Sequence, residues 1–196
     1  MTPVTNPLLG IMDSGISGNL VTGNYYSIST GTVTGSSVSS IVFSSIPQTF
    51  AHLEARITAK SAISTNDDNF YFRFNTDTSG STSCNWHDFV SYNSGSVGGD
   101  SLTGQSNGFA ARCTGSGSGS NSNQYGIGIL FIADYTNPNK YKVTKSLVGH
   151  DDTSGVGYGG IASSVWQSFN AINQLTFYFP GFNTAVGSTV ALYGVK

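Results

Sequence analysis

The sequence predicts an all-β protein: an antiparallel β-sandwich, jelly-roll-like, with about ten strands and an extended N-terminal arm. Three observations lead to this class. Apolar and polar residues alternate in many short segments, as they do in strands with one buried face. Clusters of Gly, Ser, Asn and Asp separate these segments, and such residues favour turns. No stretch of twelve or more residues has the apolar spacing of an amphipathic helix.

Three segments alternate most cleanly and are predicted to be half-buried strands. Their inward residues are Phe70, Phe72 and Phe74, then Leu53, Ala55, Ile57 and Ala59, and finally Leu175, Phe177 and Phe179. Segments 127–134 and 190–195 are apolar on both faces, which is typical of strands in the middle of a packed two-sheet structure or at an interface. Further candidate strands are 25–33, 38–43, 84–92, 108–113, 141–148 and 161–166, at the spacing of a sandwich or jelly roll.

The chain divides into an arm, residues 1–23, and a single β-sandwich domain, residues 24–196. Within the domain, segments 94–108 and 114–123 are rich in Gly and Ser and are predicted to be loops. The arm folds onto its own domain or lies on a neighbouring subunit. In the second case its apolar residues would bind the partner: Val4, Leu8, Leu9, Ile11 and Met12.

The composition is unusually poor in charge. Charged residues make up 9% of the chain and the formal net charge is -2, whereas typical soluble domains carry about 25% charged residues. So few cations argue against nucleic acid as a partner, because Lys and Arg must neutralise phosphates. The N-terminus lacks the pattern of a secretory signal, and the longest apolar runs are too short to span a bilayer. We therefore expect a soluble protein with Cys84 and Cys113 as free thiols.

Catalytic motifs are not convincing in this sequence. There is no G-x-S-x-G, and the G-x-G-x-x-G match at 155–160 precedes a strand-like segment rather than a helix, so it is interpreted as a glycine-rich loop. The pairs Asp67-Asp68 and Asp151-Asp152 lie in turn-like settings, where a calcium site stays open as an alternative. We predict no catalytic residue, no cofactor and no structural metal, and hence no enzyme.

Aromatic residues make up 12% of the chain and suggest a second class of function. Tyr or Trp side chains exposed on a sheet could stack on sugar rings, and Trp86 and Trp166 are the candidates for such a platform. Both lie inside predicted strands, and core packing is the favoured interpretation for them. Carbohydrate therefore remains a possible ligand in the alternative reading.

Two stretches carry a resemblance. Segments 41–53, IVFSSIPQTFAHL, and 188–196, STVALYGVK, resemble small structural proteins of tailed bacteriophages. In that group a strand ends in a turn of the FSSIPQTY-HL type and the chain closes on an ALYG-K strand. The opening 6–18, NPLLGIMDSGISG, is similar to the same group. The match covers the two ends and the first third of the chain, and its motifs are structural.

The resemblance implies a virion protein made in the cytoplasm of the bacterial host. We expect a capsid decoration or cement protein that stabilises the shell by binding the major capsid protein or other virion proteins, and we expect a homo-oligomer. Glycine contributes to this preference: the chain has 25 glycines, each costing roughly 0.5–1 kcal/mol relative to alanine inside a strand, and contacts with neighbours would offset that. The alternative is a tail-fibre or receptor-binding module that recognises carbohydrate.

Overall fold

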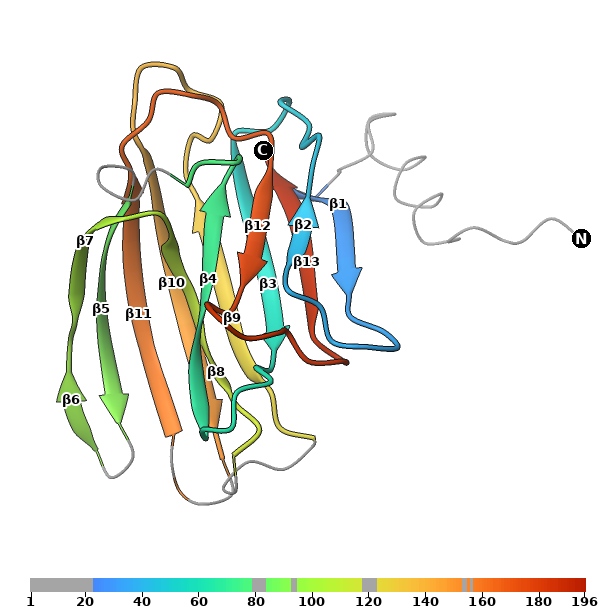
Figure 1. The fold of residues 1–196 in the computed structure, drawn as a ribbon. Coiled ribbons are helices and arrows are strands. Elements are labelled where there is room, and N and C mark those ends of the chain that lie inside the picture. Colours follow the sequence, from blue (N-terminus) through green and yellow to red (C-terminus); the bar gives the residue numbers. More distant parts are fainter. Residues whose placement is uncertain (1–22, 79–83, 93–94, 118–122, 153–154, 156) are drawn as a thin grey trace, which may run out of the picture.

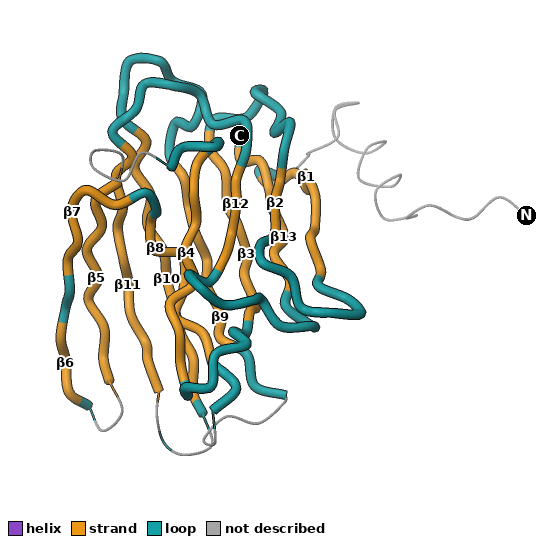
Figure 2. The backbone as a smooth tube through the Cα atoms, in the orientation of Figure 1, coloured by secondary structure: helices purple, strands orange, loops and turns teal. Residues whose placement is uncertain are grey.

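Two packed β-sheets make up the computed structural model, which describes residues 23–78, 84–92, 95–117, 123–152, 155 and 157–196 (Figure 1). The described residues form no helix, and their loops gather at the two ends of the sheets (Figure 2). The strands are β1 (Tyr25–Thr32), β2 (Ile41–Phe43), β3 (His52–Ala59), β4 (Asp67–Phe74), β5 (Cys84–Tyr92), β6 (Ser96–Gly98), β7 (Ser101–Gln105), β8 (Gly108–Thr114), β9 (Gly126–Ile132), β10 (Lys142–Asp151), β11 (Gly157–Trp166), β12 (Leu175–Tyr178) and β13 (Thr189–Val195).

Eight of these strands form a jelly roll. Taken in chain order, they are β1, β2, β3, β4, β8, β9, β12 and β13, and they pair first with last and then inward. The pairs are β1 with β13, β2 with β12, β3 with β9, and β4 with β8, all antiparallel. The resulting sheet orders, β1-β13-β3-β9 and β2-β12-β4-β8, are those of two interlocked Greek keys. The predicted fold class is therefore confirmed.

The other five strands are two insertions that widen one sheet. β5, β6 and β7 lie in the chain between β4 and β8, and β10 and β11 lie between β9 and β12. They join edge to edge beyond β9, which gives a nine-stranded sheet in the order β1-β13-β3-β9-β10-β11-β5-β6, with β7 also paired to β5. The four-stranded sheet covers only one face of this larger sheet (Figure 1). The opposite face, here called the outer face, has no layer of described residues over it.

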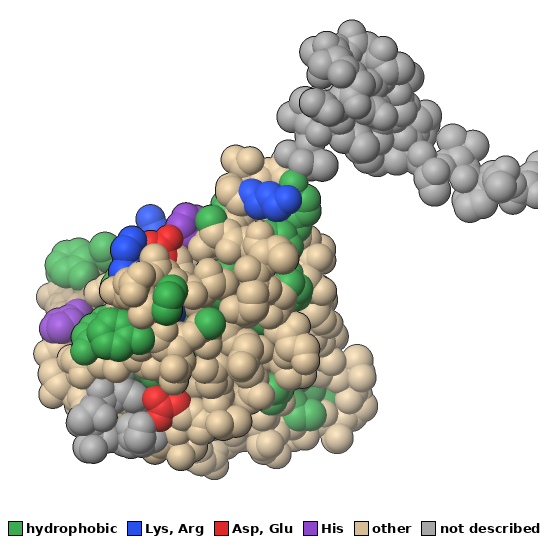
Figure 3. Space-filling model, turned by 90° about the horizontal axis from the view of Figure 1, so that it is seen from above, with side chains coloured by type: hydrophobic (Ala, Val, Ile, Leu, Met, Phe, Trp, Pro, Cys, Tyr) green, Lys and Arg blue, Asp and Glu red, His purple; other side chains and the backbone are tan. Residues whose placement is uncertain are grey.

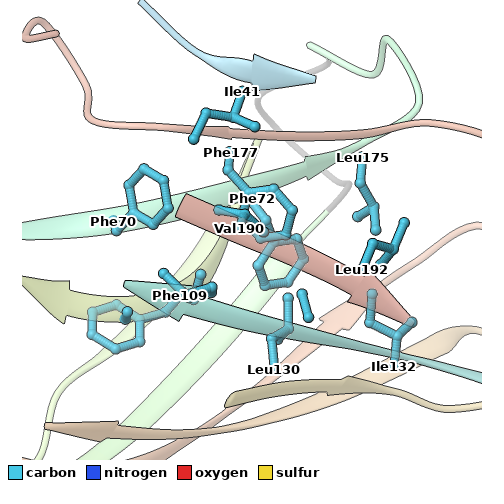
Figure 4. Close-up of a cluster of buried hydrophobic side chains, with 14 of the residues drawn as sticks. Ile41, Phe70, Phe72, Phe109, Leu130, Ile132, Leu175, Phe177, Val190 and Leu192 are labelled. Atoms are coloured by element: carbon cyan, nitrogen blue, oxygen red, sulfur yellow. The ribbon is translucent and has the colours of Figure 1, made fainter. Parts of the chain in front are cut away.

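The core lies between the two sheets and is rich in phenylalanine. Phe70, Phe72 and Phe74 all point inward, as predicted from their spacing. The ring of Phe70 lies 4.5 Å from that of Phe179 and 6.0 Å from that of Phe177, centroid to centroid. From the larger sheet, Leu130, Ile132, Val190 and Leu192 complete the cluster (Figure 4).

Glycine lets the two sheets approach closely where β9 crosses β8. A Cβ atom added to Gly126 would lie 2.4 Å from the Cα of Cys113, and one added to Gly128 would lie 2.8 Å from the Cβ of Ala111. Real Cβ atoms do not pack at such distances. These strand glycines therefore serve the monomer's own packing, which weakens the argument that their cost calls for stabilising neighbours.

Two predictions about loops are wrong. Segment 94–108 contains β6 and β7, and residues 157–160 of the glycine-rich segment belong to β11. β6 and β7 are short edge strands that pair only with β5, and they lack the alternation of a half-buried strand. A side chain of β5 also holds this segment: Oδ1 of Asp88 accepts a hydrogen bond from the Asp100 amide at 2.7 Å. The glycines of β11 lie between β10 and β5, whose backbones hydrogen-bond to them on both sides.

Candidate interaction surface

A row of exposed apolar side chains crosses the outer face of the larger sheet. Phe89 of β5, Ile161 of β11, Leu147 of β10 and Ile129 of β9 are direct neighbours in register. Their exposed fractions are 59%, 57%, 58% and 43%. These four residues are called the apolar row. Exposed aliphatic residues scattered singly are ordinary, whereas contiguous exposed apolar patches are typical of interaction surfaces. The apolar row is therefore the candidate for such a surface.

The strand periodicity explains how the apolar row arises. In β9 and β10, buried and exposed residues alternate, with Leu130 and Val148 facing the core and Ile129 and Leu147 facing outward. Both faces of β9 are thus apolar, whereas the inward face of β10 is mostly polar, with Lys142, Thr144, Ser146 and His150 buried. Among the described residues, only the inward face of these strands has a partner layer. Three of the four strands that carry the row belong to the insertions, so the row belongs to the widened part of the jelly roll rather than to its eight-stranded core.

The apolar row forms the floor of a shallow hollow of about 850 Å³. Around the row, the lining includes Tyr25, Phe131 and Ala162 together with the polar side chains of His87 and Lys145. Most of the lining is thus apolar, and its charged residues are Glu54, Asp88 and Lys145. A surface of this kind suits a partner that buries aliphatic side chains and places a few polar groups at the rim.

The carboxylate of Glu54, which lines the hollow, is neutralised within the chain. Glu54 accepts a hydrogen bond from the hydroxyl of Tyr25 at 3.1 Å and one from Nε of Arg56 at 3.0 Å. The hydrogen bond to Glu54 raises the pKa of the Tyr25 hydroxyl above its ordinary value. The guanidinium of Arg56 also lies 4.9 Å from the centroid of the Tyr193 ring. Contacts within the chain therefore fix the side chains of Glu54, Tyr25 and Arg56 before any partner binds.

Lys145 is different, because its ammonium has no carboxylate partner among the described residues. Its Nζ lies 5.9 Å from the centroid of the Phe131 ring, and the ion pairs found in the described ranges involve other cations. In register, Lys145 lies opposite Phe131 on one side and Ser163 on the other. The hollow therefore offers one cation that can meet an acidic group of a partner.

Both tryptophans lie in the core, so neither Trp86 nor Trp166 presents the exposed ring that the alternative, a sugar platform, requires. Each is only 3% exposed. The indole of Trp86 packs on the Phe109 ring at 5.5 Å, and Nε1 of Trp166 donates to Oδ2 of Asp77 at 2.8 Å. The favoured interpretation, core packing, is confirmed, and neither indole is accessible to a sugar ring.

The paired carboxylates make structural contacts. Asp67 forms an ion pair with Arg112, and Asp68 accepts a hydrogen bond from the hydroxyl of Ser61 at 2.7 Å, while burial raises the pKa of the Asp68 carboxyl. The histidine beside the second pair, His150, is buried in β10. Across the described ranges, no group of three or more His, Cys, Asp or Glu residues comes together as a metal site would require.

The predicted partner-binding residues of the arm, Val4, Leu8, Leu9, Ile11 and Met12, lie outside the described residues. The apolar row itself was not singled out from the sequence. One signal pointed to it: segment 127–134 is apolar on both faces, which is typical of a central strand or an interface. β9 is both, since it is central in its sheet and carries Ile129 on the outer face.

Most of the remaining surface is polar but uncharged. Seen from one end, side chains other than the apolar and charged ones, together with the backbone, dominate the view, and blue and red patches are few (Figure 3). This agrees with the low charged fraction of the sequence, 9%. Among the described residues, no helix is long and apolar enough to cross a membrane.

Comparison of the chain with protein-family models, with curated proteins and with solved structures found no match in any of the three.

Proposed function

We propose that this chain is a structural protein of a tailed-phage virion, a capsid decoration protein that docks on the assembled shell through the apolar row. The observation that carries the proposal is the row itself: four exposed apolar side chains on four adjacent strands, at the floor of one hollow. Such a surface is costly to leave in water, and binding a partner removes that cost.

Three further features support the proposal. Jelly rolls occur in viral capsid proteins, although lectins and other proteins share the fold, so the fold alone does not select a function. The low charge of the chain suits a protein packed against neighbours. The segments that resemble phage structural proteins, 41–53 and 188–196, lie at the β2–β3 connection and the closing strand β13.

A carbohydrate-binding module is the weaker candidate. Its expected platform, Trp86 and Trp166, is buried. The apolar row contains Ile161, Leu147 and Ile129 beside a single aromatic residue, and branched aliphatic side chains offer no flat face for a sugar ring. A protein surface that contributes its own apolar side chains fits the row better.

Fractionation of virions tests the proposal. Particles of the phage that encodes this chain would be separated into capsids and tails, and each fraction would be probed with an antibody against the purified protein. The proposal predicts the chain in the capsid fraction, at a fixed number of copies per shell. Detection only in tails would overturn the capsid assignment, and absence from both fractions would overturn the virion assignment.

A further inference from the structure

We propose that the arm of each chain covers its own apolar row until a virion partner displaces it. The residues that would lie on the row are Leu8, Leu9, Ile11 and Met12. This inference rests on the proposed function, because it takes the row as the docking face, and it adds a means of regulating that face. Four observations lead to it.

The first observation is where the arm joins the domain. Tyr25, the first residue of β1, lines the hollow that has the apolar row as its floor. β1 is the edge strand of the larger sheet. The described chain therefore starts, at Gly23 and Asn24, next to a residue that lines the hollow.

The second observation is reach. In the sheet order, β5 is six strand positions from β1, and neighbouring strands lie about 4.8 Å apart, so Phe89, at the far end of the row, lies roughly 29 Å across the sheet from the start of the arm. Met12 precedes Tyr25 by thirteen positions, and an extended chain of that length spans up to about 43 Å. The apolar part of the arm can thus reach the whole row with slack.

The third observation is chemical complementarity. Positions 8–12 hold four apolar residues, broken only by Gly10, and the apolar row presents four apolar side chains. Asp13, directly after Met12, is the only charged side chain in residues 1–22. Lys145, beside the row, is the cation of the hollow without a carboxylate partner among the described residues. The arm therefore offers apolar side chains to the row and a carboxylate to Lys145.

The fourth consideration decides between the arm of the same chain and that of a second copy. A segment tethered by a short flexible linker that can span the distance experiences an effective concentration of about 1 mM at its site. A second copy at micromolar concentration competes poorly against that. We therefore assign the arm to its own domain.

Photo-crosslinking of the full-length protein tests the inference. A Leu9→benzoylphenylalanine variant would be prepared unlabelled and nitrogen-15-labelled, the two mixed in equal amounts at micromolar concentration and irradiated, and the cross-linked peptides identified by mass spectrometry. The inference predicts cross-links to β5, β9, β10 or β11, the four strands that carry the row, whose two peptides are both light or both heavy. Pairs of one light and one heavy peptide would show that the arm lies on a second copy, which overturns the inference.

A matched pair of second-site variants tests whether the apolar row is the target. Leu147→Ser should remove most of the cross-linked product, and Val42→Ser should leave its yield unchanged. Val42 is a suitable control because it is 51% exposed on β2, in the other sheet. Both positions are exposed, so both variants should fold, and a thermal unfolding curve would verify this. Equal yields from the two variants, or cross-links elsewhere in the chain, would overturn the inference.

The two proposals can fail separately. Cross-linking uses purified protein without virion particles, so an arm that does not reach the row leaves the docking proposal standing. Conversely, absence of the chain from virions would leave a cross-link between the arm and the row intact as a property of the free protein.

Discussion

Gly126 lies where β9 crosses β8, and we predict that Gly126→Ala destabilises the protein. The added Cβ would lie 2.4 Å from the Cα of Cys113 and 2.5 Å from the carbonyl oxygen of Arg112. Both are backbone atoms, so no side-chain rotation relieves the contact. The two sheets would have to separate locally, and neighbouring core side chains would lose packing contacts.

The magnitude follows from two opposing effects. Overpacking a dense core costs about 1–3 kcal/mol, and alanine regains roughly 0.5–1 kcal/mol over glycine inside a strand. With the middle of each range, the net loss should be roughly 1 kcal/mol. Gly159→Ala is the matched control: it lies on the outer face of β11, where the nearest atom to an added Cβ is Oγ of Ser91 at 3.8 Å. That variant should be as stable as the wild type or slightly more stable.

Urea denaturation of the wild type and both variants provides the assay. The slope of the free energy of unfolding against urea concentration should be the same for all three proteins. The midpoint should fall for Gly126→Ala and hold or rise for Gly159→Ala. If Gly126→Ala were as stable as the wild type, the strand glycines would not be explained by close approach of the sheets, and the reasoning would be refuted.

Three further predictions concern buried polar groups. The thiols of Cys84 and Cys113 are free and buried, and burial raises the pKa of Cys84 to about 12, so a thiol reagent should react only in step with urea unfolding; rapid reaction of the native protein would contradict this. The buried Nζ of Lys142 donates to two loop carbonyls at 2.7 and 2.9 Å, so Lys142→Met should cost about 1–2 kcal/mol in urea unfolding, and an unchanged midpoint would count against that role. Burial lowers the pKa of His150 below its ordinary value of 6.5. As the pH falls, this histidine is therefore protonated in the unfolded state before it is protonated in the native state. The free energy of unfolding should then decrease as the pH drops below about 6.5. His150→Phe should weaken this pH dependence, and an identical pH profile would contradict the assignment.

Much of the fold could be predicted because alternation reports a half-buried strand directly. Phe70, Phe72 and Phe74 share one face in any sheet, so their burial follows from spacing alone. Edge strands give no such signal. β7, with Leu102 as its only large apolar residue, is held by backbone pairing to β5, and a sequence rich in Gly and Ser conceals that pairing.

The candidate surface could not be predicted from the same patterns. A strand that is apolar on both faces, such as β9, is equally compatible with two covered faces or with one covered and one exposed. The outcome depends on where the smaller sheet ends and on which strands the insertions pair with, both of which are long-range properties. The burial of Trp86 could not be predicted with certainty for a similar reason, because its indole faces the core only in the register that β5 adopts beside β11.

The central claim is that the apolar row is the docking face, and one binding measurement tests it most directly. Full-length wild-type, Leu147→Glu and Val42→Glu proteins would be titrated onto capsids that lack the chain, and bound protein would be quantified after sedimentation. A carboxylate buried against apolar side chains is unfavourable even beside a cation such as Lys145, because its desolvation costs several kcal/mol. Leu147→Glu should therefore weaken binding by at least about tenfold, while Val42→Glu should bind like the wild type. Equal binding by all three proteins would contradict the claim.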